Sequence, residues 1–415
     1  MASSWQTCTI DDLCLSIVDC VNRTAPVVDG PTPFRMIRTT NVRDGFVDLT
    51  ETRFVNEDVF KTWTRRQLPE AGDIILTREA PLGEVGLLRG GSLAFLGQRL
   101  VSYRVNPALL DNRYFLYYLR SAAGRAQVLA LGSGATVHHM RVPEAKRLRI
   151  PTPPVAEQER IGAILGTYDD LIETNRRRVA LLENMARGLF EEWFVRFRFP
   201  GHEAVTMVDT PNGPLPQGWR WSSFNELVTE VRDGVSPTDV PADTPYVGLE
   251  HLPRRSTTMA EWGRAADVGS LKLSFRRGDV LFGKIRPYFH KVGWAPCDGV
   301  ASSDAMIYRP RGLNVVAMAL AVASSDGFVA ASVQTSNGTK MPRANPAVLR
   351  AYPVATDDGK WVRRFGSAML PAIELAASLA SANRGLAASR DLLLPRLISG
   401  QLSVAAAEHE LVEAA

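Results

Sequence analysis

The sequence predicts a fold of the α/β (α+β) class, in which two globular domains alternate with two long helices as an internal repeat. Three observations support this. The chain has 415 residues, two to three times the usual length of one domain. Two sets of short motifs recur 206 to 208 residues apart. Each set ends in a stretch whose apolar residues recur at helical spacing.

The composition is that of a soluble globular protein, with 45% hydrophobic and 22% charged residues. It excludes a collagen, a disulfide scaffold and a chain disordered throughout. No uninterrupted apolar run approaches the length of a membrane span, and the first residues do not resemble a signal peptide. The cysteines are Cys8, Cys14, Cys20 and Cys297, with no Cys-x-x-Cys pair. We therefore expect reduced thiols, no metal site, no membrane and a cytoplasmic location.

The charge is mildly basic, with a net value of +4 from 48 basic and 44 acidic residues. Of the basic residues, 41 are arginine and 7 are lysine. Arginine is well suited to bidentate contacts with phosphate and guanine. Genome base composition explains this enrichment equally well, so charge alone does not establish a polyanionic partner.

The repeat is visible at two places. Residues 71–78, Ala-Gly-Asp-Ile-Ile-Leu-Thr-Arg, match residues 277–284, Arg-Gly-Asp-Val-Leu-Phe-Gly-Lys, with an offset of 206. Further on, Asn175-Arg176 matches Asn383-Arg384 with an offset of 208. The second offset would also pair Ile161 with Met369. Two matches at nearly one offset indicate a tandem duplication of units of about 200 residues.

The helical part of each unit has the clearest local pattern. The spacing predicts a first helix from about Ala156 to Phe197, after the proline-rich stretch 151–154. Its seam is spaced by sevens and includes one polar residue, Asn175, of the kind that fixes register in a coiled coil. The second helix is predicted from Lys360 to about Gly400, with a kink at Pro395. We expect the two helices to pair, although each could instead pack on its own domain.

The globular parts are predicted to be mixed. Residues 73–77, 100–105, 279–282 and 305–309 read as strands, and residues 113–120 and 315–323 as helices. Two glycine-containing loops, 131–136 and 336–343, occupy corresponding places and lie next to or contain basic residues.

A search for catalytic motifs finds none with support. Residues 278–284 have the spacing of a Walker A loop, but Ile285 stands where Ser or Thr must bind magnesium. Glu144-Ala-Lys146 is half of a nuclease motif without a partner aspartate. His138 and His139 alone are a weak metal signal. A duplicated module with basic loops on a helical rod is suited to DNA, a polymer with a repeating backbone.

The chain resembles the specificity subunit of Type I restriction-modification systems. The matching segments are residues 150–161, Ile-Pro-Thr-Pro-Pro-Val-Ala-Glu-Gln-Glu-Arg-Ile, residues 169–175, Pro216-Gln-Gly-Trp219, and residues 390–401, Arg-Asp-Leu-Leu-Leu-Pro-Arg-Leu-Ile-Ser-Gly-Gln. The second repeat departs from the pattern, because residues 351–358 lack the Pro-Pro-x-x-Glu-Gln start of the first helix.

The resemblance implies a noncatalytic subunit whose two target recognition domains each read half of a split, asymmetric DNA site. The helices would pair as an antiparallel coiled coil with a pseudo-twofold repeat, set the spacing, and dock two methyltransferase subunits. Those would carry S-adenosylmethionine, and restriction subunits would use ATP and magnesium; no cofactor is expected on this chain. The segments are 1–152 and 200–355 for the domains, 153–199 and 356–402 for the helices, and 403–415 for a disordered tail.

The candidate residues follow from these roles. The expected DNA contacts are basic or polar residues in or near the loops: Arg78, Arg99, His138, His139, Arg141, Lys284, Arg286, Tyr288, His290, Lys291, Lys340 and Arg343. The expected helix seam or partner-docking residues are Ile161, Leu165, Tyr168, Ile172, Asn175, Leu182, Met185, Leu189, Met369, Ile373, Asn383 and Leu394.

Two other functions remain possible at this stage. An enzyme with a degenerate nuclease or methyltransferase site would need a cofactor or metal motif that the search does not find. A purely structural coiled-coil adaptor would show no sequence-selective DNA binding in any assembly.

Overall fold

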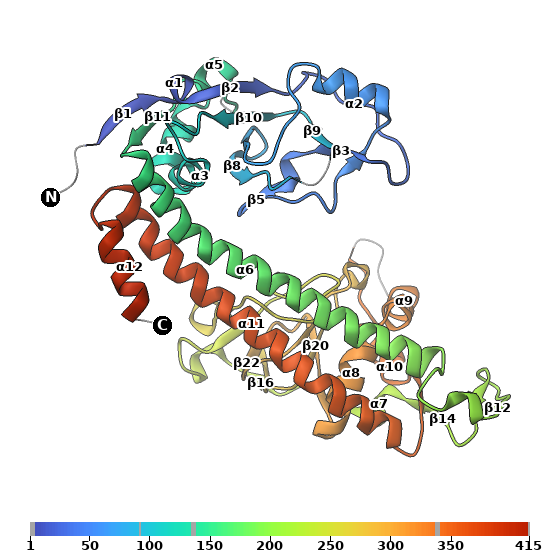
Figure 1. The fold of residues 1–415 in the computed structure, drawn as a ribbon. Helices are drawn as coiled ribbons and strands as arrows, with labels where there is room; N and C mark the ends of the chain where they lie inside the picture. Colours follow the sequence, from blue (N-terminus) through green and yellow to red (C-terminus); the bar gives the residue numbers. More distant parts are fainter. Residues whose placement is uncertain (1–4, 91–92, 134–137, 337–340, 414–415) are drawn as a thin grey trace. The chain divides into compact units, whose positions relative to one another are not determined.

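The protein was analysed as a computed structural model that describes residues 5–90, 93–133, 138–336 and 341–413. It consists of two compact units (Figure 1). Unit 1 contains residues 1–170 and 386–415, and unit 2 contains residues 171–385. Each unit therefore combines one globular domain with parts of both long helices.

The globular part of unit 1 is a mixed domain built around a six-stranded sheet of order β2-β10-β7-β8-β5-β4 and a three-stranded sheet of order β6-β3-β9. Its elements are β1 (Gln6–Thr9), α1 (Ile10–Leu13), β2 (Cys14–Asp19), β3 (Phe34–Ile37), β4 (Val42–Arg43), β5 (Gly45–Val47), β6 (Arg53–Phe54), α2 (Glu57–Thr64), β7 (Ile74–Arg78), β8 (Leu82–Leu87), β9 (Leu93–Leu96), β10 (Leu100–Val105), α3 (Asn112–Arg120), α4 (Ala122–Leu131), α5 (Val142–Ala145) and β11 (Arg149–Thr152).

The globular part of unit 2 contains a four-stranded sheet of order β15-β23-β20-β21 and a five-stranded sheet of order β16-β19-β22-β17-β18. Its elements are β12 (Met207–Val208), β13 (Leu215–Pro216), β14 (Arg220–Ser223), α7 (Phe224–Leu227), β15 (Val228–Val231), β16 (Gly234–Val235), β17 (Pro245–Val247), β18 (Gly263–Arg264), β19 (Lys272–Phe275), β20 (Val280–Gly283), β21 (Val292–Trp294), β22 (Gly299–Ala301), β23 (Ala305–Pro310), α8 (Val316–Ala323), α9 (Asp326–Gln334), α10 (Pro346–Arg350) and β24 (Pro353–Thr356).

The two domains share one topology. The order β2-β10-β7-β8 in the first corresponds to β15-β23-β20-β21 in the second, and β1-β11 corresponds to β14-β24. In both domains the sheet is followed by a pair of helices, α3 and α4 or α8 and α9. The predicted strands and helices of both domains are present within one residue or so of their expected ends.

The repeated Gly-Asp motif has a structural role. Asp73 is buried and accepts a hydrogen bond from the backbone N–H of Glu70. It also forms a bidentate ion pair with Arg104 of β10, whose Nε and Nη2 each lie 2.9 Å from one carboxylate oxygen. Asp279 does the same with the N–H of Arg276 and with Arg309 of β23, at 2.9 and 2.8 Å. Each aspartate thus closes a turn and ties two neighbouring strands together, because a buried carboxylate needs a charged partner.

The first long helix is α6 (Val155–Phe190), extended by a π-helical turn over Glu191–Val195. Gln158 in its first turn is fully buried and fixes its start. Its side-chain oxygen accepts the N–H of Asp111, and its amide nitrogen donates to the carbonyl oxygen of Pro153. The glutamine of the Pro-Pro-x-x-Glu-Gln stretch therefore attaches the helix to the domain that precedes it.

The second long helix, α11 (Lys360–Ile398), starts differently. Asp357 precedes it and accepts the backbone N–H groups of Gly359 and Trp361, at 3.2 and 2.8 Å. This carboxylate replaces the glutamine anchor that the second repeat lacks. The helix continues through Pro395 to Ile398, so the proline lies in its last turn.

The two helices are antiparallel where they meet within unit 2. Asn175 Nδ2 donates to Asn383 Oδ1 at 2.9 Å, and Asn383 Nδ2 donates to the carbonyl oxygen of Ile172 at 3.2 Å. Further along, Phe190 packs on Phe365 with ring centroids 6.4 Å apart. Residue numbers rise on one helix as they fall on the other. The two asparagines that the repeat makes equivalent are thus direct partners. The helices contact each other as expected, and the alternative, that each packs only on its own domain, does not hold.

One predicted equivalence needs correction. Gly162 lies against Asp111 before α3, and Gly366 lies against Asn314 before α8, so these glycines correspond at an offset of 204. Ile161 therefore corresponds to Phe365, not to Met369. Because the asparagines correspond at 208, the second helix has four more residues, about one turn, between its domain anchor and its asparagine.

The segment 403–415 was expected to be disordered, and this is wrong for most of it. Residues Val404–Glu413 form α12. Val404 and Ala407 are buried in the core of unit 1 together with Leu402, and Glu408 pairs with Arg160 of α6. Val404 and Ala407 are three residues apart, so they lie on one face of the helix, and that face packs.

By length and composition alone, helix α11 is long and apolar enough to cross a membrane. The same holds for the bent helix pair 313–323 and 326–334, if the pair is taken as one segment. Trp361, Phe365 and Met369 of α11 lie in the core of unit 2, and Leu394 and Leu397 lie in the core of unit 1. Of the apolar stretch of α11, 28% is buried in the structure.

Candidate nucleic-acid interface and helical seam

A polar cluster forms at the end of β7 in the first domain. Glu79 follows β7, and its carboxylate lies 3.6 Å from Arg99 Nε and 3.4 Å from His139 Nδ1. Arg99 lies in the turn before β10 with a φ of 69°, a region that non-glycine residues rarely adopt. Three chain segments that are distant in sequence thus bring Arg99 and His139 to one place.

Two further candidates lie on the surface beside this cluster. His138 is exposed, and Arg141 has 70% of its side chain exposed while it pairs with Glu144 at 2.6 Å. An exposed ion pair of this kind contributes little to stability, so Arg141 can exchange Glu144 for another anion at small cost. The structure thus groups four of the five predicted contacts of the first domain.

Arg78 is the exception. It is 8% exposed, and its guanidinium contacts the carbonyl oxygen of Met140 at 3.3 Å and the carboxylate of Asp19 at 3.9 Å. Burial makes it a structural residue that joins β7 to the loop after α4. Its prediction as a DNA contact is corrected for that reason.

In the second domain, Lys284, Arg286, Tyr288 and Arg343 come together. Ile285 and Arg343 form an antiparallel bridge, and the N–H of Arg286 donates to the carbonyl oxygen of Pro342 at 2.8 Å. Arg286 and Arg343 are exposed, and Tyr288 is 52% exposed. Arg286 has a φ of 49°, so the backbone holds this arginine in an unfavourable conformation in front of Pro287.

Two residues predicted to contact DNA in this domain, His290 and Lys291, instead contact backbone carbonyl oxygens within the domain. His290 is 5% exposed, and its Nε2 lies 2.8 Å from the carbonyl oxygen of Ser324. Lys291 is half-buried and its ammonium group donates to the carbonyl oxygen of Leu249. Desolvation lowers the pKa of both groups. Lys340 lies outside the described residues.

Sequence analysis missed Arg254. Its guanidinium lies over the ring of Phe289 at 4.3 Å, and this ring is 4.8 Å from that of Tyr288. Arg254 therefore extends the exposed group of the second domain. No sequence signal could have found it, because 32 residues separate it from Arg286.

The predicted seam residues divide by burial. Ile161, Leu165 and Leu394 are buried in the core of unit 1, with Tyr168 packed against it. Met369 is buried in unit 2, with Leu189 and Ile373 packed beside it. Ile172 and Asn175 are buried, whereas Asn383 and Leu182 are half-buried. Met185 is 59% exposed and is not part of a seam, because it lies on the outer side of α6.

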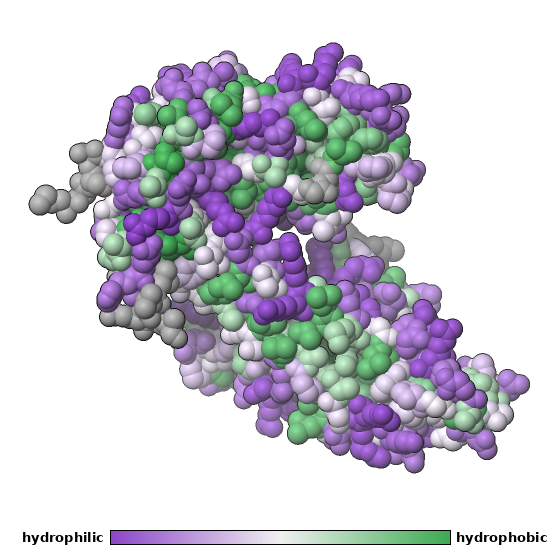
Figure 2. All heavy atoms as spheres, in the orientation of Figure 1, coloured by the Kyte–Doolittle hydropathy of each residue, from purple (hydrophilic) through white to green (hydrophobic). Residues whose placement is uncertain are grey.

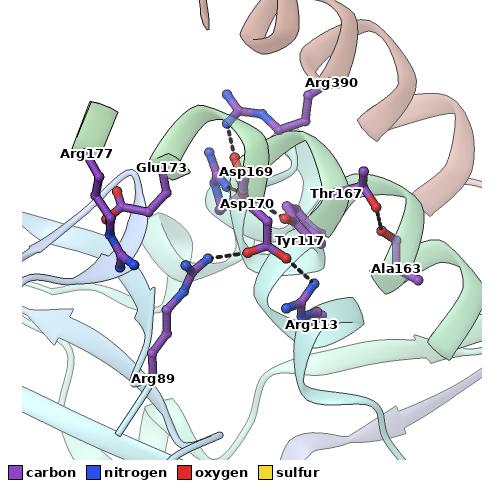
Figure 3. A network of polar contacts seen from close by, with 11 residues as sticks. Arg89, Arg113, Tyr117, Ala163, Thr167, Asp169, Asp170, Glu173, Arg177 and Arg390 are labelled. Carbon is purple, nitrogen blue, oxygen red and sulfur yellow. Dashed lines mark hydrogen bonds and ion pairs between the residues drawn. The ribbon is translucent and has the colours of Figure 1, made fainter. Parts of the chain in front are cut away.

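A polar network in unit 1 ties both helices to the first domain (Figure 3). Asp169 of α6 is buried, and it accepts hydrogen bonds from Tyr117 Oη and Arg120 Nη1, both at 2.7 Å, and from Arg390 of α11. The neighbouring Asp170 accepts from Arg89 and Arg113, at 2.7 and 3.1 Å. The Asp-Asp pair in residues 169–175 therefore anchors the helices.

Apolar side chains also reach the surface of the long helices, among the hydrophilic residues seen in Figure 2. Leu171, Leu181 and Met185 on α6 are 46%, 63% and 59% exposed, and Leu375 and Leu392 on α11 are 50% and 71% exposed. Helical spacing places the three residues of α6 on one side of that helix.

Among the described residues, no group of three or more His, Cys, Asp or Glu side chains is placed to hold a metal ion. The polar groups that the structure does bring together are arginines, with histidine, tyrosine and lysine. These groups donate hydrogen bonds to phosphates and base edges.

Comparison with known proteins shows what the first repeat is similar to. Residues 3–184 match the model of the Type I restriction modification DNA specificity domain. The chain is similar to the Type I restriction enzyme MjaIX specificity subunit of Methanocaldococcus jannaschii, with 27% identity over 206 residues, and to the EcoDI specificity subunit of Escherichia coli, with 23% identity over 225 residues. These matches cover 48% and 49% of this chain, and the chain spans about half the length of these relatives, 46% and 50%.

The fold extends the likeness beyond the first domain. The structure superposes on the S subunit of a Type I restriction-modification system from M. genitalium with a TM-score of 0.57 and 14% identity. The superposition covers 95% of this chain and 96% of that one. The chain therefore shares the fold of that S subunit over nearly its whole length, including both domains and both long helices, and this likeness agrees with the fold that the sequence resemblance implies.

Proposed function

We propose that this chain is the noncatalytic subunit that selects DNA sequence in a Type I restriction-modification complex. Each globular domain reads one half of a bipartite, asymmetric site. The observation that carries the proposal is the duplication: one topology occurs twice, the first copy matches a DNA specificity domain, and each copy is followed by a long helix. Two readers in one chain suit two different half-sites.

The grouped residues supply the chemistry for reading. In the first domain they are Arg99, His138, His139 and Arg141; in the second they are Lys284, Arg286, Tyr288, Arg343 and Arg254. Arginine can donate two parallel hydrogen bonds to guanine, and the remaining cations can hold phosphates. The buried Arg78 and His290 support these surfaces from beneath.

The helices determine the distance between the readers and dock the partners. Two methyltransferase subunits bind the exposed apolar residues of α6 and α11, and restriction subunits join the complex for cleavage. S-adenosylmethionine belongs to the methyltransferase, and ATP with magnesium belongs to the restriction subunit. The complex acts in the cytoplasm, where its DNA lies.

A reconstitution tests this division of labour. The purified chain, the methyltransferase encoded beside it, and their mixture are each given radiolabelled S-adenosylmethionine and genomic DNA from cells lacking the system. Label in DNA is expected only from the mixture. Label transferred by the chain alone would contradict the noncatalytic role, and equal, sequence-independent label from the methyltransferase alone would contradict the specificity role.

A further inference from the structure

A cavity of about 950 Å³, partly open to solvent, lies in unit 2 between its parts of the two long helices and the globular domain. Phe190 of α6, Phe365 and Met369 of α11, Met318 and Val322 of α8, and Trp294 of β21 are among the residues that line it. Sites for small molecules have volumes of about 300–1,000 Å³ and mostly apolar walls.

The corresponding place in the first repeat is filled. There, Arg113 and Tyr117 of α3 extend to Asp170 and Asp169 on α6 (Figure 3). Arg120 of α3 also donates to Asp169. At the offset of 204 set by Gly162 and Gly366, the positions of those three residues are occupied by Ala317, Ala321 and Ser324, which line the cavity.

The helix side of the network is replaced in the same way. Asp169 corresponds to Ile373 at the offset of 204, and Arg390, which lies beyond the asparagines, corresponds to Leu182 at the offset of 208; Ile373 and Leu182 both line the cavity. A charged network has thus given way to small and apolar side chains on three elements at once. The cavity in unit 2 is therefore a consequence of these residue differences between the two repeats.

This space is partly open to solvent, so its apolar walls are left in contact with water, which is unfavourable. An apolar occupant would remove that contact and pack against the walls.

The polar groups at the cavity include one cation without an acidic partner. Arg187 is exposed and donates to the carbonyl oxygen of Arg255 at 3.1 Å, and within the described part of the chain no carboxylate lies within ion-pair distance of it. The acids nearby are engaged: Glu183 accepts from Ser256, Thr257 and Thr258, Glu191 lies 3.7 Å from Arg196, and Asp326 lies 3.8 Å from Arg255 and 3.6 Å from His290.

We propose that this cavity binds a small amphipathic molecule with an apolar or aromatic body and one anionic group, the body between α8 and the long helices and the anion beside Arg187. The site is confined to the second repeat.

The test uses 1-anilinonaphthalene-8-sulfonate, whose aromatic rings and sulfonate match this description. Titration of the full-length chain, followed by probe fluorescence and by thermal unfolding, should show one saturable site and a rise in Tm. Ala321→Tyr restores the side chain of Tyr117 in the first repeat and should weaken binding at least about tenfold. Ala368→Tyr adds the same group on the exposed side of α11 and should leave binding unchanged.

Arg187→Gln provides an independent variant, because this residue is exposed and its replacement leaves the core intact. It should weaken the sulfonate probe several-fold while leaving a neutral naphthalene probe unaffected. Binding that does not saturate, or that survives Ala321→Tyr unchanged, overturns the proposal. So does loss of methyltransferase binding in Ala321→Tyr with displacement of the probe by that subunit, because the cavity would then receive protein side chains.

Discussion

His290 lies in a buried part of the second domain, where its Nε2 lies 2.8 Å from the carbonyl oxygen of Ser324. Desolvation lowers its pKa below the ordinary value of 6.5. As the pH falls below that value, the imidazole of the unfolded chain takes up a proton before that of the folded chain. The folded state therefore loses stability over this interval.

Replacing this histidine should reduce the acid sensitivity. We expect His290→Asn to show a smaller loss of unfolding free energy between pH 7.5 and 5.5 than the parent chain, measured by urea denaturation. Asparagine tolerates the positive φ of 52° at this position. His138→Asn, at an exposed site, is the control and should keep the parent's pH dependence. An unchanged slope in His290→Asn would refute the assignment.

Residue type alone did not reveal burial. Arg78 and Lys284 occupy equivalent positions after the repeated Gly-Asp strand, and both are basic. Arg78 is buried against Asp19 and Met140, whereas Lys284 is half-buried beside exposed Arg286. The residues that bury a basic side chain come from distant segments of the chain. The sequence could therefore predict the candidate DNA contacts as a group, but it could not separate the exposed candidates from the buried ones.

At the scale of elements, the pair Asn175–Asn383 fixes how α6 and α11 align. Each single substitution by leucine leaves one amide without its partner in a largely buried seam, which costs about 1–3 kcal/mol. The double substitution removes both amides and should cost less than the two single changes together. A double-mutant cycle by chemical denaturation should give a coupling of about 1–3 kcal/mol. Additive effects would show that the hydrogen bond does not stabilise the pairing.

Helix α12 should contribute to the stability of unit 1. Val404 is 3% exposed in the core that also contains Leu402 and Ala407. Val404→Asp would bury a charge without a partner and should lower Tm by several degrees. Ala405→Asp places the same charge at the adjacent exposed position and should change Tm little. Equal effects of the two substitutions would indicate that α12 does not pack as described.

The long helices were the most predictable elements, because apolar spacing over about 40 residues is a strong signal. Their starts, near Val155 and Lys360, were expected within a residue. The packing of α12 was missed, since a ten-residue alanine-rich stretch carries little signal of its own. The sequence offset between equivalent residues is 204 at the helix starts and 208 at the asparagines. Sequence analysis missed this difference, because only contacts such as that of Gly162 with Asp111 reveal it.

At the scale of the whole molecule, helix length should determine the gap between half-sites. Inserting four residues in each long helix, after Asp170 and after Gly385, adds about one turn, or about 6 Å, to both. With base pairs about 3.4 Å apart, the unread gap should grow by one or two base pairs while both half-sites stay the same. Sequencing of methylated DNA would show this. A change in half-site sequence would contradict the separation of roles.

The duplication itself was predictable, whereas the asymmetry between the copies was not. The Gly-Asp and Asn-Arg matches revealed two units, and their shared topology confirms them. Arg113 and Tyr117 of the first copy are replaced by alanines at the corresponding positions of the second. The cavity is what gives this difference a structural meaning.

The central claim is that this chain selects the DNA sequence that a partner methylates. Long-read detection of methylated adenine should compare cells that express the chain with its neighbouring methyltransferase and cells that lack only the chain. We predict a split motif with a fixed gap that appears only when the chain is present. An identical methylation pattern in both cell lines, with the methyltransferase active, would contradict the account.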